Sequence, residues 1–166
     1  EKAAEQSRGR GKPVYQNERK GGNASNGAIH AEQRWVNVFA PDKKEAEALQ
    51  KLGFTAVQSA RMDGIFRGNA FVSSLGEGIA NQLVLKADGS QFMSFSKGSS
   101  TQSYPSSLMG SIALIRQTLS DANWYQQAYG KTDVRYFGAP IEYNAALESL
   151  AKLEQQGLIF ESADDR

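Results

Sequence analysis

The chain has 166 residues, a formal net charge of +1, one histidine and no cysteine. This length suits one domain with a buried core, whereas the lack of cysteine excludes a disulfide framework, a thiolate nucleophile and a zinc finger. No apolar run approaches the roughly 20 residues that span a bilayer, so no transmembrane helix is expected. Residues 1–5 contain no initiator methionine and no apolar signal segment, which is typical of an internal start and leaves the compartment open.

Residues 1–29 form a polar and basic segment that we expect to be flexible or extended. The segment is rich in Gly, Asn, Arg and Ser, and such a composition cannot bury enough apolar surface to offset its ordering entropy. The Arg8-Gly9-Arg10-Gly11 run could contact RNA phosphates, but it is short and has few aromatic residues for base stacking. A solvated loop is therefore the favoured interpretation, and neither a nucleic-acid nor a membrane partner is predicted.

Residues 30–166 are expected to form the α/β body, which opens with a short helix. Asp42 is predicted to be the N-cap of this helix, because its carboxylate can accept hydrogen bonds from the first free backbone N–H groups. Leu49 and Leu52 are expected to face the core, and Gly53 stands where a glycine commonly ends a helix.

Short apolar runs after this helix predict several strands. Residues 54–60 are β-branched and lightly alternating, which makes them the strongest strand candidate, and residues 70–73 could form a second strand. Two further runs, 82–87 and 92–96, flank Asp88-Gly89, a dipeptide typical of hairpin turns. We therefore expect these two runs to pair with each other as an antiparallel hairpin.

Two long helices are predicted in the second half of the chain. The first covers about residues 107–129, because its apolar residues recur at steps of four and three and form one stripe: Leu108, Ile112, Ile115, Leu119 and Ala122. The second covers about residues 143–156 and ends at Gly157, and a short buried strand, Leu158–Glu161, follows it. Helices that alternate with short strands indicate an α/β fold, here with a mixed sheet and an added hairpin.

Five spaced motifs carry a family resemblance. They are residues 53–57 (GFTAV), 63–68 (DGIFRG), 104–110 (YPSSLMG), 112–119 (IALIRQTL) and 158–165 (LIFESADD). This pattern resembles the amidohydrolase superfamily, and especially its imidazolonepropionase-like branch. The resemblance extends over roughly residues 30–165.

The resemblance implies part of a TIM-barrel-like domain, with a divalent, zinc-type metal at the carboxyl ends of the strands. Such a metal lowers the pKa of a bound water, which then attacks an amide or cyclic amide carbon. The paired histidines, later histidine ligands and catalytic aspartate of that family have no counterpart here, where His30 is the only imidazole. Truncation at both ends, or loss of the site in a subfamily, would account for this. We expect this chain alone to bind no metal strongly and to be inactive.

Three residues are candidates for the site that the resemblance implies. Asp63 and Arg67 follow the strongest strand, where a loop would meet a substrate, and an arginine can bind a carboxylate with two hydrogen bonds. The alternative is a turn aspartate and a surface arginine that pair locally. Glu161 ends the last strand, where related proteins place a metal ligand, and the alternative is a strand-end glutamate in solvent or in an ion pair. A lone histidine such as His30 is more often structural than a ligand.

Two functions of different classes remain open, with a weaker third. The first is a fragment of a metal-dependent hydrolase that acts on carbon–nitrogen bonds of a small-molecule substrate. The second is a non-catalytic binding or scaffold module that keeps the amidohydrolase architecture, and the third is an RNA-associated domain. A fragment would expose sheet edges that neighbouring strands cover in the parent protein, so self-association through these edges is also predicted.

Overall fold

The structure is a computed structural model that describes residues 26–129, 135–136 and 139–162. Its elements, in chain order, are a 3-10 helix (Trp35–Val38), α1 (Lys43–Lys51), β1 (Ala56–Ser59), β2 (Phe66–Asn69), β3 (Phe71–Ser74), α2 (Ala80–Leu83), β4 (Val84–Lys86), β5 (Gln91–Ser94), α3 (Leu108–Ala128), β6 (Arg135–Tyr136), β7 (Ala139–Pro140), α4 (Ala145–Ala151), α5 (Leu153–Gln156) and β8 (Leu158–Glu161).

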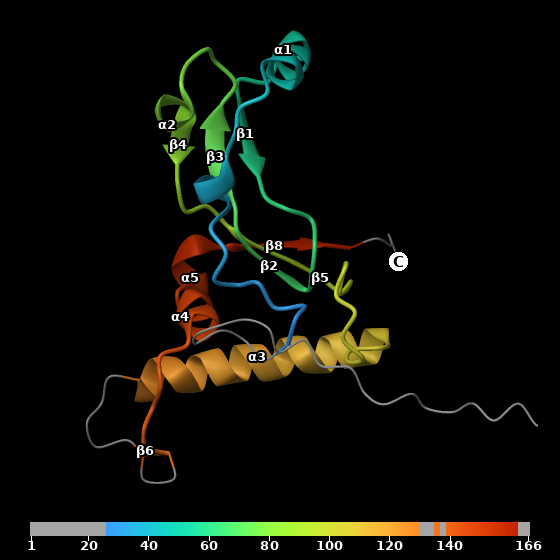
Figure 1. The fold of residues 1–166 in the computed structure, drawn as a ribbon, viewed down its shortest axis with the longest axis vertical. Helices are drawn as coiled ribbons and strands as arrows, with labels where there is room; N and C mark the ends of the chain where they lie inside the picture. The colour runs from blue at the N-terminus through green and yellow to red at the C-terminus, as the bar shows by residue number, and fades with distance from the viewer. Residues whose placement is uncertain (1–25, 130–134, 137–138, 163–166) are drawn as a thin grey trace, which may run out of the picture.

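These elements form two tiers (Figure 1). The lower tier holds the long helix α3, the shorter α4 and α5, and a sheet of order β2-β5-β8, which we call the lower sheet. The upper tier holds a sheet of order β1-β3-β4, the upper sheet, together with α1 and α2. β5 and β8 run parallel, whereas all the other strand pairs, including the small β6–β7 pair, are antiparallel.

A long bent hairpin joins the two sheets. β2 and β3 are separated by Ala70 alone, and β4 and β5 return alongside them, β4 on β3 and β5 on β2. At the bend, the Ala70 N–H donates to the Ser90 carbonyl at 3.0 Å and the Gly89 N–H donates to the Ala70 carbonyl at 2.7 Å. The expected hairpin between residues 82–87 and 92–96 is therefore wrong. Each run already has an extended partner beside it, so Asp88-Gly89 carries the chain from one sheet to the other instead of reversing it.

Residues 26–34 run beside β2 and close the other edge of the lower sheet. Isolated parallel bridges join Ile29 to Phe66 and Arg34 to Asn69. Residues 26–29, which the sequence grouped with the amino-terminal segment, are buried here. Ala28 and Ile29 belong to a core under the lower sheet that α3 and α4 cover. The other members of this core are Ala31, Ile65, Phe66, Met93, Ala122, Ala146 and Leu150.

Helix α1 has the predicted ends but not the predicted packing. The Asp42 carboxylate accepts hydrogen bonds from the Lys44 and Glu45 N–H groups, and Gly53 follows the helix at φ +93°. Leu49 is half-buried, but Leu52 is 74% exposed, so its expected place in the core is wrong. The reason is that α1 lies above the upper sheet without burying any of its residues.

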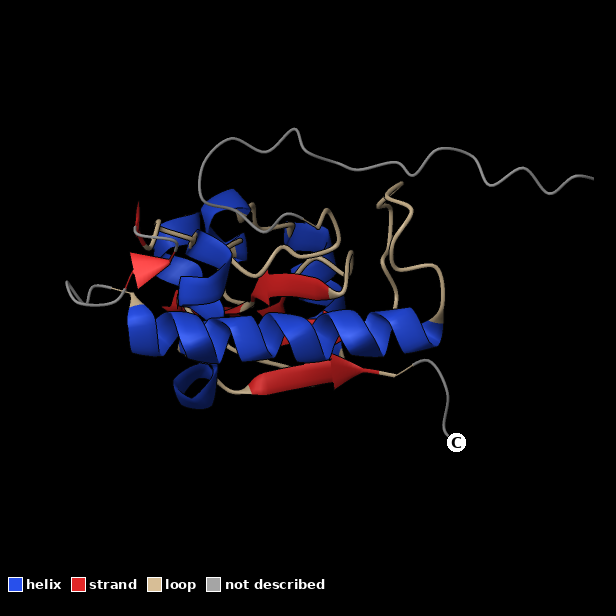
Figure 2. Cartoon of the chain, turned by 90° about the horizontal axis from the view of Figure 1, so that it is seen from below, coloured by secondary structure: helices blue, strands red, loops and turns tan. Residues whose placement is uncertain are grey.

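The second half of the chain follows its predicted order with two corrections. α3 is a single helix of 21 residues, close to the predicted range of about 107–129, and its N-cap is Ser107. The second predicted helix is divided at Lys152 into α4 and α5, of 7 and 4 residues, so α3 is the one long helix in the described part of the chain. β8 forms at the predicted residues but is exposed along its whole length, because it is an edge strand that pairs with β5. Figure 2 shows β8 at the periphery, beyond α3.

The α/β class and the mixed sheet are confirmed. The strands of the described ranges make two open three-stranded sheets and one two-stranded sheet, and none of these closes into a barrel. No described helix combines the length and the apolar character needed to cross a membrane.

Candidate functional site

The glycines of the DGIFRG motif allow the chain to pack closely. Gly64 and Gly68 have φ values of +95° and +92°, a region that side chains with a Cβ rarely adopt. A Cβ at Gly68 would lie 2.5 Å from the Gln33 carbonyl oxygen, and one at Gly64 would lie 2.8 Å from His30 Cδ2. These two glycines therefore let residues 26–34 approach β2, with Asp63 just before this strand and Arg67 within it.

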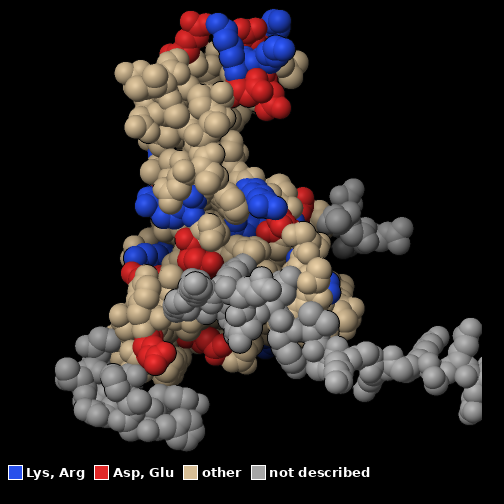
Figure 3. All heavy atoms as spheres, in the orientation of Figure 1, with Lys and Arg blue, Asp and Glu red and all other residues tan. Residues whose placement is uncertain are grey.

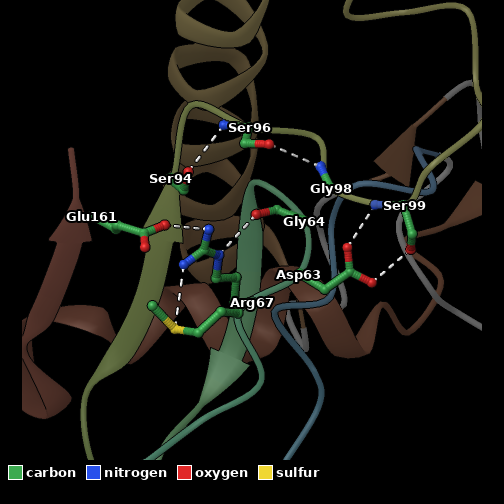
Figure 4. A network of polar contacts seen from close by, with 9 residues as sticks. Asp63, Gly64, Arg67, Ser94, Ser96, Gly98, Ser99 and Glu161 are labelled. Atoms are coloured by element: carbon green, nitrogen blue, oxygen red, sulfur yellow. Dashed lines mark hydrogen bonds and ion pairs between the residues drawn. The ribbon is translucent and has the colours of Figure 1, made fainter. Parts of the chain in front are cut away.

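Arg67 points into the protein from β2 and is 3% exposed. Its Nη2 lies 2.6 Å from Glu161 Oε2, its Nε donates to the Gly64 carbonyl at 3.1 Å, and its Nη1 contacts Met62 Sδ at 3.4 Å (Figure 4). The sequence assigned Arg67 to a substrate and Glu161 to a metal, whereas the structure brings the two together as one ion pair. This pair joins β2 to β8 across β5.

Asp63 binds the polar loop that follows β5. Its Oδ1 accepts from the Ser99 N–H and its Oδ2 from the Ser99 hydroxyl, both at 2.7 Å (Figure 4). These two hydrogen bonds hold the pKa of the Asp63 carboxyl below its ordinary value, and the nearby Arg61 charge, 3.4 Å away, acts in the same direction. Gly98, at φ +60°, sits against the same carboxylate, where a Cβ would overlap Oδ1. Asp63 thus anchors a loop, and its ionic partner is Arg61 rather than Arg67.

A run of serines shapes the start of that loop. The Ser94 hydroxyl accepts from the Ser96 N–H at 3.0 Å, and the Ser96 hydroxyl accepts from the Gly98 N–H at 3.2 Å. Such hydrogen bonds between a side chain and the backbone two residues further along stabilise turns. The loop therefore reaches Asp63 in a defined conformation.

A pocket of about 320 Å³ opens beside Asp63 and is lined by His30, Gln33, Trp35, Arg61 and Asp63. We call it the His30 pocket. All five side chains carry hydrogen-bonding groups, but the indole N–H of Trp35 already donates to the Arg67 carbonyl. The sole histidine of the chain thus stands at a polar surface and not on an apolar face.

Sequence reasoning missed Arg61, Trp35 and Ser99. Arg61 stands only two residues before Asp63, and the Ser-rich composition of the loop was visible, but neither feature indicates which side chain a loop will meet. The partner of Asp63 lies 36 positions away and the partner of Arg67 lies 94 positions away. Contacts at such separations depend on the tertiary fold.

The described residues do not fit a zinc-type centre. No group of three or more His, Asp or Glu side chains in the described ranges is arranged to hold a metal ion. In addition, Glu161 is engaged by Arg67, and both oxygens of Asp63 accept hydrogen bonds from Ser99. A metal at either carboxylate would have to displace these contacts.

The fold is similar to that of a known hydrolase. A solved structure, the amidohydrolase from Thermotoga maritima MSB8, aligns with a TM-score of 0.61 at 17% sequence identity, and the match covers 77% of this chain and 35% of that one. At this identity the similarity shows an amidohydrolase-like fold, and the chain spans about a third of the length of that protein. No family model matches the chain, and no curated protein matches its sequence significantly.

Proposed function

We propose that this chain is part of a hydrolase of the imidazolonepropionase-like branch of the amidohydrolases, acting on an amide or cyclic amide bond of a small molecule. The observation that carries the proposal is the amidohydrolase-like fold over 77% of the chain. The five spaced motifs of the sequence point to the same superfamily, and their described parts reach into β1, β2, α3 and β8.

In this proposal the described residues build and orient the loops around a substrate. The Arg67–Glu161 pair ties β2 to β8, and the Asp63–Ser99 contacts fix the loop after β5. Arg61 and Gln33, at the His30 pocket, would then supply hydrogen bonds to polar groups of the substrate.

The hydrolytic step would need groups that the described residues do not supply. In the parent family a divalent metal, when bound, activates water for attack on the amide carbon. Glu161 and Asp63 are engaged in contacts within the chain. We therefore expect this chain by itself to bind no metal strongly and to be inactive.

The test compares the 166-residue chain with the product of the complete reading frame that contains it. Both proteins would be analysed for bound metal and assayed for ammonia or amine release from a panel of amides and cyclic amides. We expect chelator-sensitive hydrolysis by the complete product and none by the chain. If the chain holds stoichiometric metal that is lost on Glu161→Ala, the expectation that the chain alone binds no metal and is inactive is wrong. If the complete product hydrolyses none of these compounds, the proposal that it is a hydrolase is wrong.

The second candidate is a non-catalytic module with the same architecture. The observation in its favour is that both candidate carboxylates are used for contacts within the protein, Asp63 with Ser99 and Glu161 with Arg67. If this function is correct, the complete product will bind small molecules but will neither hold metal nor turn them over.

A further inference from the structure

Helix α1 lies above the upper sheet and contacts it through polar groups at both ends. Lys43 Nζ lies 2.9 Å from Glu77 Oε1 at one end of the helix, and Gln50 Nε2 donates to the Leu75 carbonyl at 2.7 Å near the other. The helix buries none of its residues. A hollow of about 750 Å³ remains between α1 and the sheet. We call it the α1 hollow.

The floor of the α1 hollow is apolar and aromatic. Phe71 and Leu83 are almost fully buried beneath it, and the Phe39 ring lies 4.8 Å from the Phe71 ring. On the helix side the small side chain of Ala46 leaves the space open. Side chains around an unfilled space lack dispersion contacts that a bound apolar group would supply. Small-molecule sites commonly have this size, an apolar lining and a few polar groups at one place.

The charged groups of the hollow are divided between its two ends. Figure 3 shows acidic and basic side chains gathered at the top of the molecule, over α1. There Lys43 faces both Glu77 and Glu47, and Asp42 and Glu45 also line the hollow. This end therefore has an excess of negative charge and would repel the carboxylate of a ligand. β1 runs from that end toward the lower sheet (Figure 1), and Arg61 follows it by two residues. Arg61 therefore lies at the end away from α1.

Arg61 can receive an anionic group. It lines both the α1 hollow and the His30 pocket, as Trp35 does, so the two spaces meet at these side chains. The side chain is 64% exposed, and its ion pair with Asp63 is long, at 3.4 Å. Asp63 already accepts two hydrogen bonds from Ser99. Most of the five N–H donors of a guanidinium therefore stay available to a ligand.

We propose that the α1 hollow binds a small aromatic carboxylate, with its ring against Trp35, Phe39 and Phe71 and its carboxylate on Arg61. The apolar floor recognises the ring, and the guanidinium selects an acid over a neutral molecule of the same shape, because charge-assisted hydrogen bonds are stronger than neutral ones. This binding site goes beyond the proposed function, since it needs neither a metal nor hydrolysis.

The experiment is calorimetric titration of the purified chain with 1-naphthaleneacetate and with the neutral 1-naphthaleneacetamide. We expect the acid to bind at least tenfold more tightly than the amide. Arg61→Gln should abolish this preference and leave the amide binding unchanged, which also shows that the variant is folded. Arg116→Gln, the same change at an exposed position of α3, is the matched control and should bind like the unmodified chain.

A second pair of variants tests the location. Ala46→Leu places a larger side chain in the α1 hollow, and leucine is a good helix former, so the helix should remain intact. The affinity for both compounds should fall at least tenfold. Ala48→Leu, on the exposed side of the same helix, should change the affinity for neither compound. Equal binding of acid and amide, an unaltered preference in Arg61→Gln, or equal effects of the two leucine variants would overturn the proposal. Absence of binding by either compound would overturn it as well.

Discussion

The lower and upper sheets each contain three strands, yet their surroundings differ. In the lower sheet β2 is buried along its whole length, with residues 26–34 at its edge and α3 and α4 covering the core. In the upper sheet α1 contributes no buried residue, and the α1 hollow separates it from the strands. A small sheet needs a packed face to be stable. The lower tier therefore supplies most of the stability, while the loosely covered upper tier offers room for a ligand.

The largest difference is expected between two identical substitutions, one in each tier. Leu150→Ala removes a side chain that is 4% exposed in the lower core, and this should cost about 2–5 kcal/mol of unfolding free energy. Leu52→Ala removes a side chain that is 74% exposed after α1, and its cost should stay within about 0.5 kcal/mol. Urea unfolding of the two variants measures both values. Equal costs would mean that the two tiers are packed alike.

A pair of glycines sharpens the comparison at the level of the backbone. Gly53 and Gly68 both have positive φ, but a Cβ at Gly53 would meet nothing within 4 Å, whereas one at Gly68 would press on the Gln33 carbonyl. Gly53→Ala should therefore cost about 1 kcal/mol, for the conformation alone. Gly68→Ala should cost about 3 kcal/mol, because overpacking is added to the strain. Thermal and urea unfolding test this order, and a reversed order would contradict the close approach of residues 26–34 to β2.

Ion pairs in the two tiers should differ in the same direction. Glu161→Ala leaves the buried Arg67 charge with neutral hydrogen-bond acceptors only, and it should lower the free energy of unfolding by about 2 kcal/mol. Arg67→Met should cost only about 1 kcal/mol, because the half-exposed Glu161 can be hydrated. The double variant should resemble Arg67→Met, and additive costs in this cycle would argue against a direct pair. In the upper tier Lys43→Met, which breaks the exposed pair with Glu77, should have no measurable effect.

The smallest expected effect is a pH dependence from Asp63. Hydrogen bonds from Ser99 lower the pKa of Asp63 in the folded protein, so its protonation favours the unfolded chain. The stability that Asp63 contributes is therefore present above the unfolded pKa of about 3.9 and is lost as the pH falls through the lower folded value. Asp63→Asn should remove this part of the acid dependence, on the order of 1 kcal/mol. The measurement is the free energy of urea unfolding of both proteins at about pH 6 and at about pH 3, on either side of the usual carboxyl pKa. An equal loss of stability in the two proteins would contradict the Asp63–Ser99 contact.

Local signals in the sequence predicted most of the elements. Asp42 acts as an N-cap, as its side-chain oxygens and position indicated, and α3 starts close to the predicted residue. Gly53 and Gly157 follow their helices at positive φ. The strongest strand candidate contains β1, shortened at both ends to Ala56–Ser59. These features depend on contacts within a few residues, which the sequence displays directly.

Pairing and burial were harder to predict. The predicted hairpin around Asp88-Gly89 was wrong because each of the two runs pairs with a different strand. β4 pairs with β3, and β5 pairs with β2. β8 has the composition of a buried strand, yet it lies at a sheet edge and is exposed. An apolar run indicates that a segment can be buried, but it does not indicate what will cover it.

The candidate site shows the same division. Asp63, Arg67 and Glu161 were identified from the sequence, by their positions next to strands and by the family resemblance. That Arg67 pairs with Glu161, that Asp63 holds Ser99, and that Arg61 faces an open hollow were decided by the tertiary structure. The sequence by itself determined the α/β class, the N-cap at Asp42 and the helix ends at Gly53 and Gly157, because these follow from interactions between near neighbours. Strand pairing, burial and the partners of each charge followed only from the fold, because they depend on residues far apart in the chain.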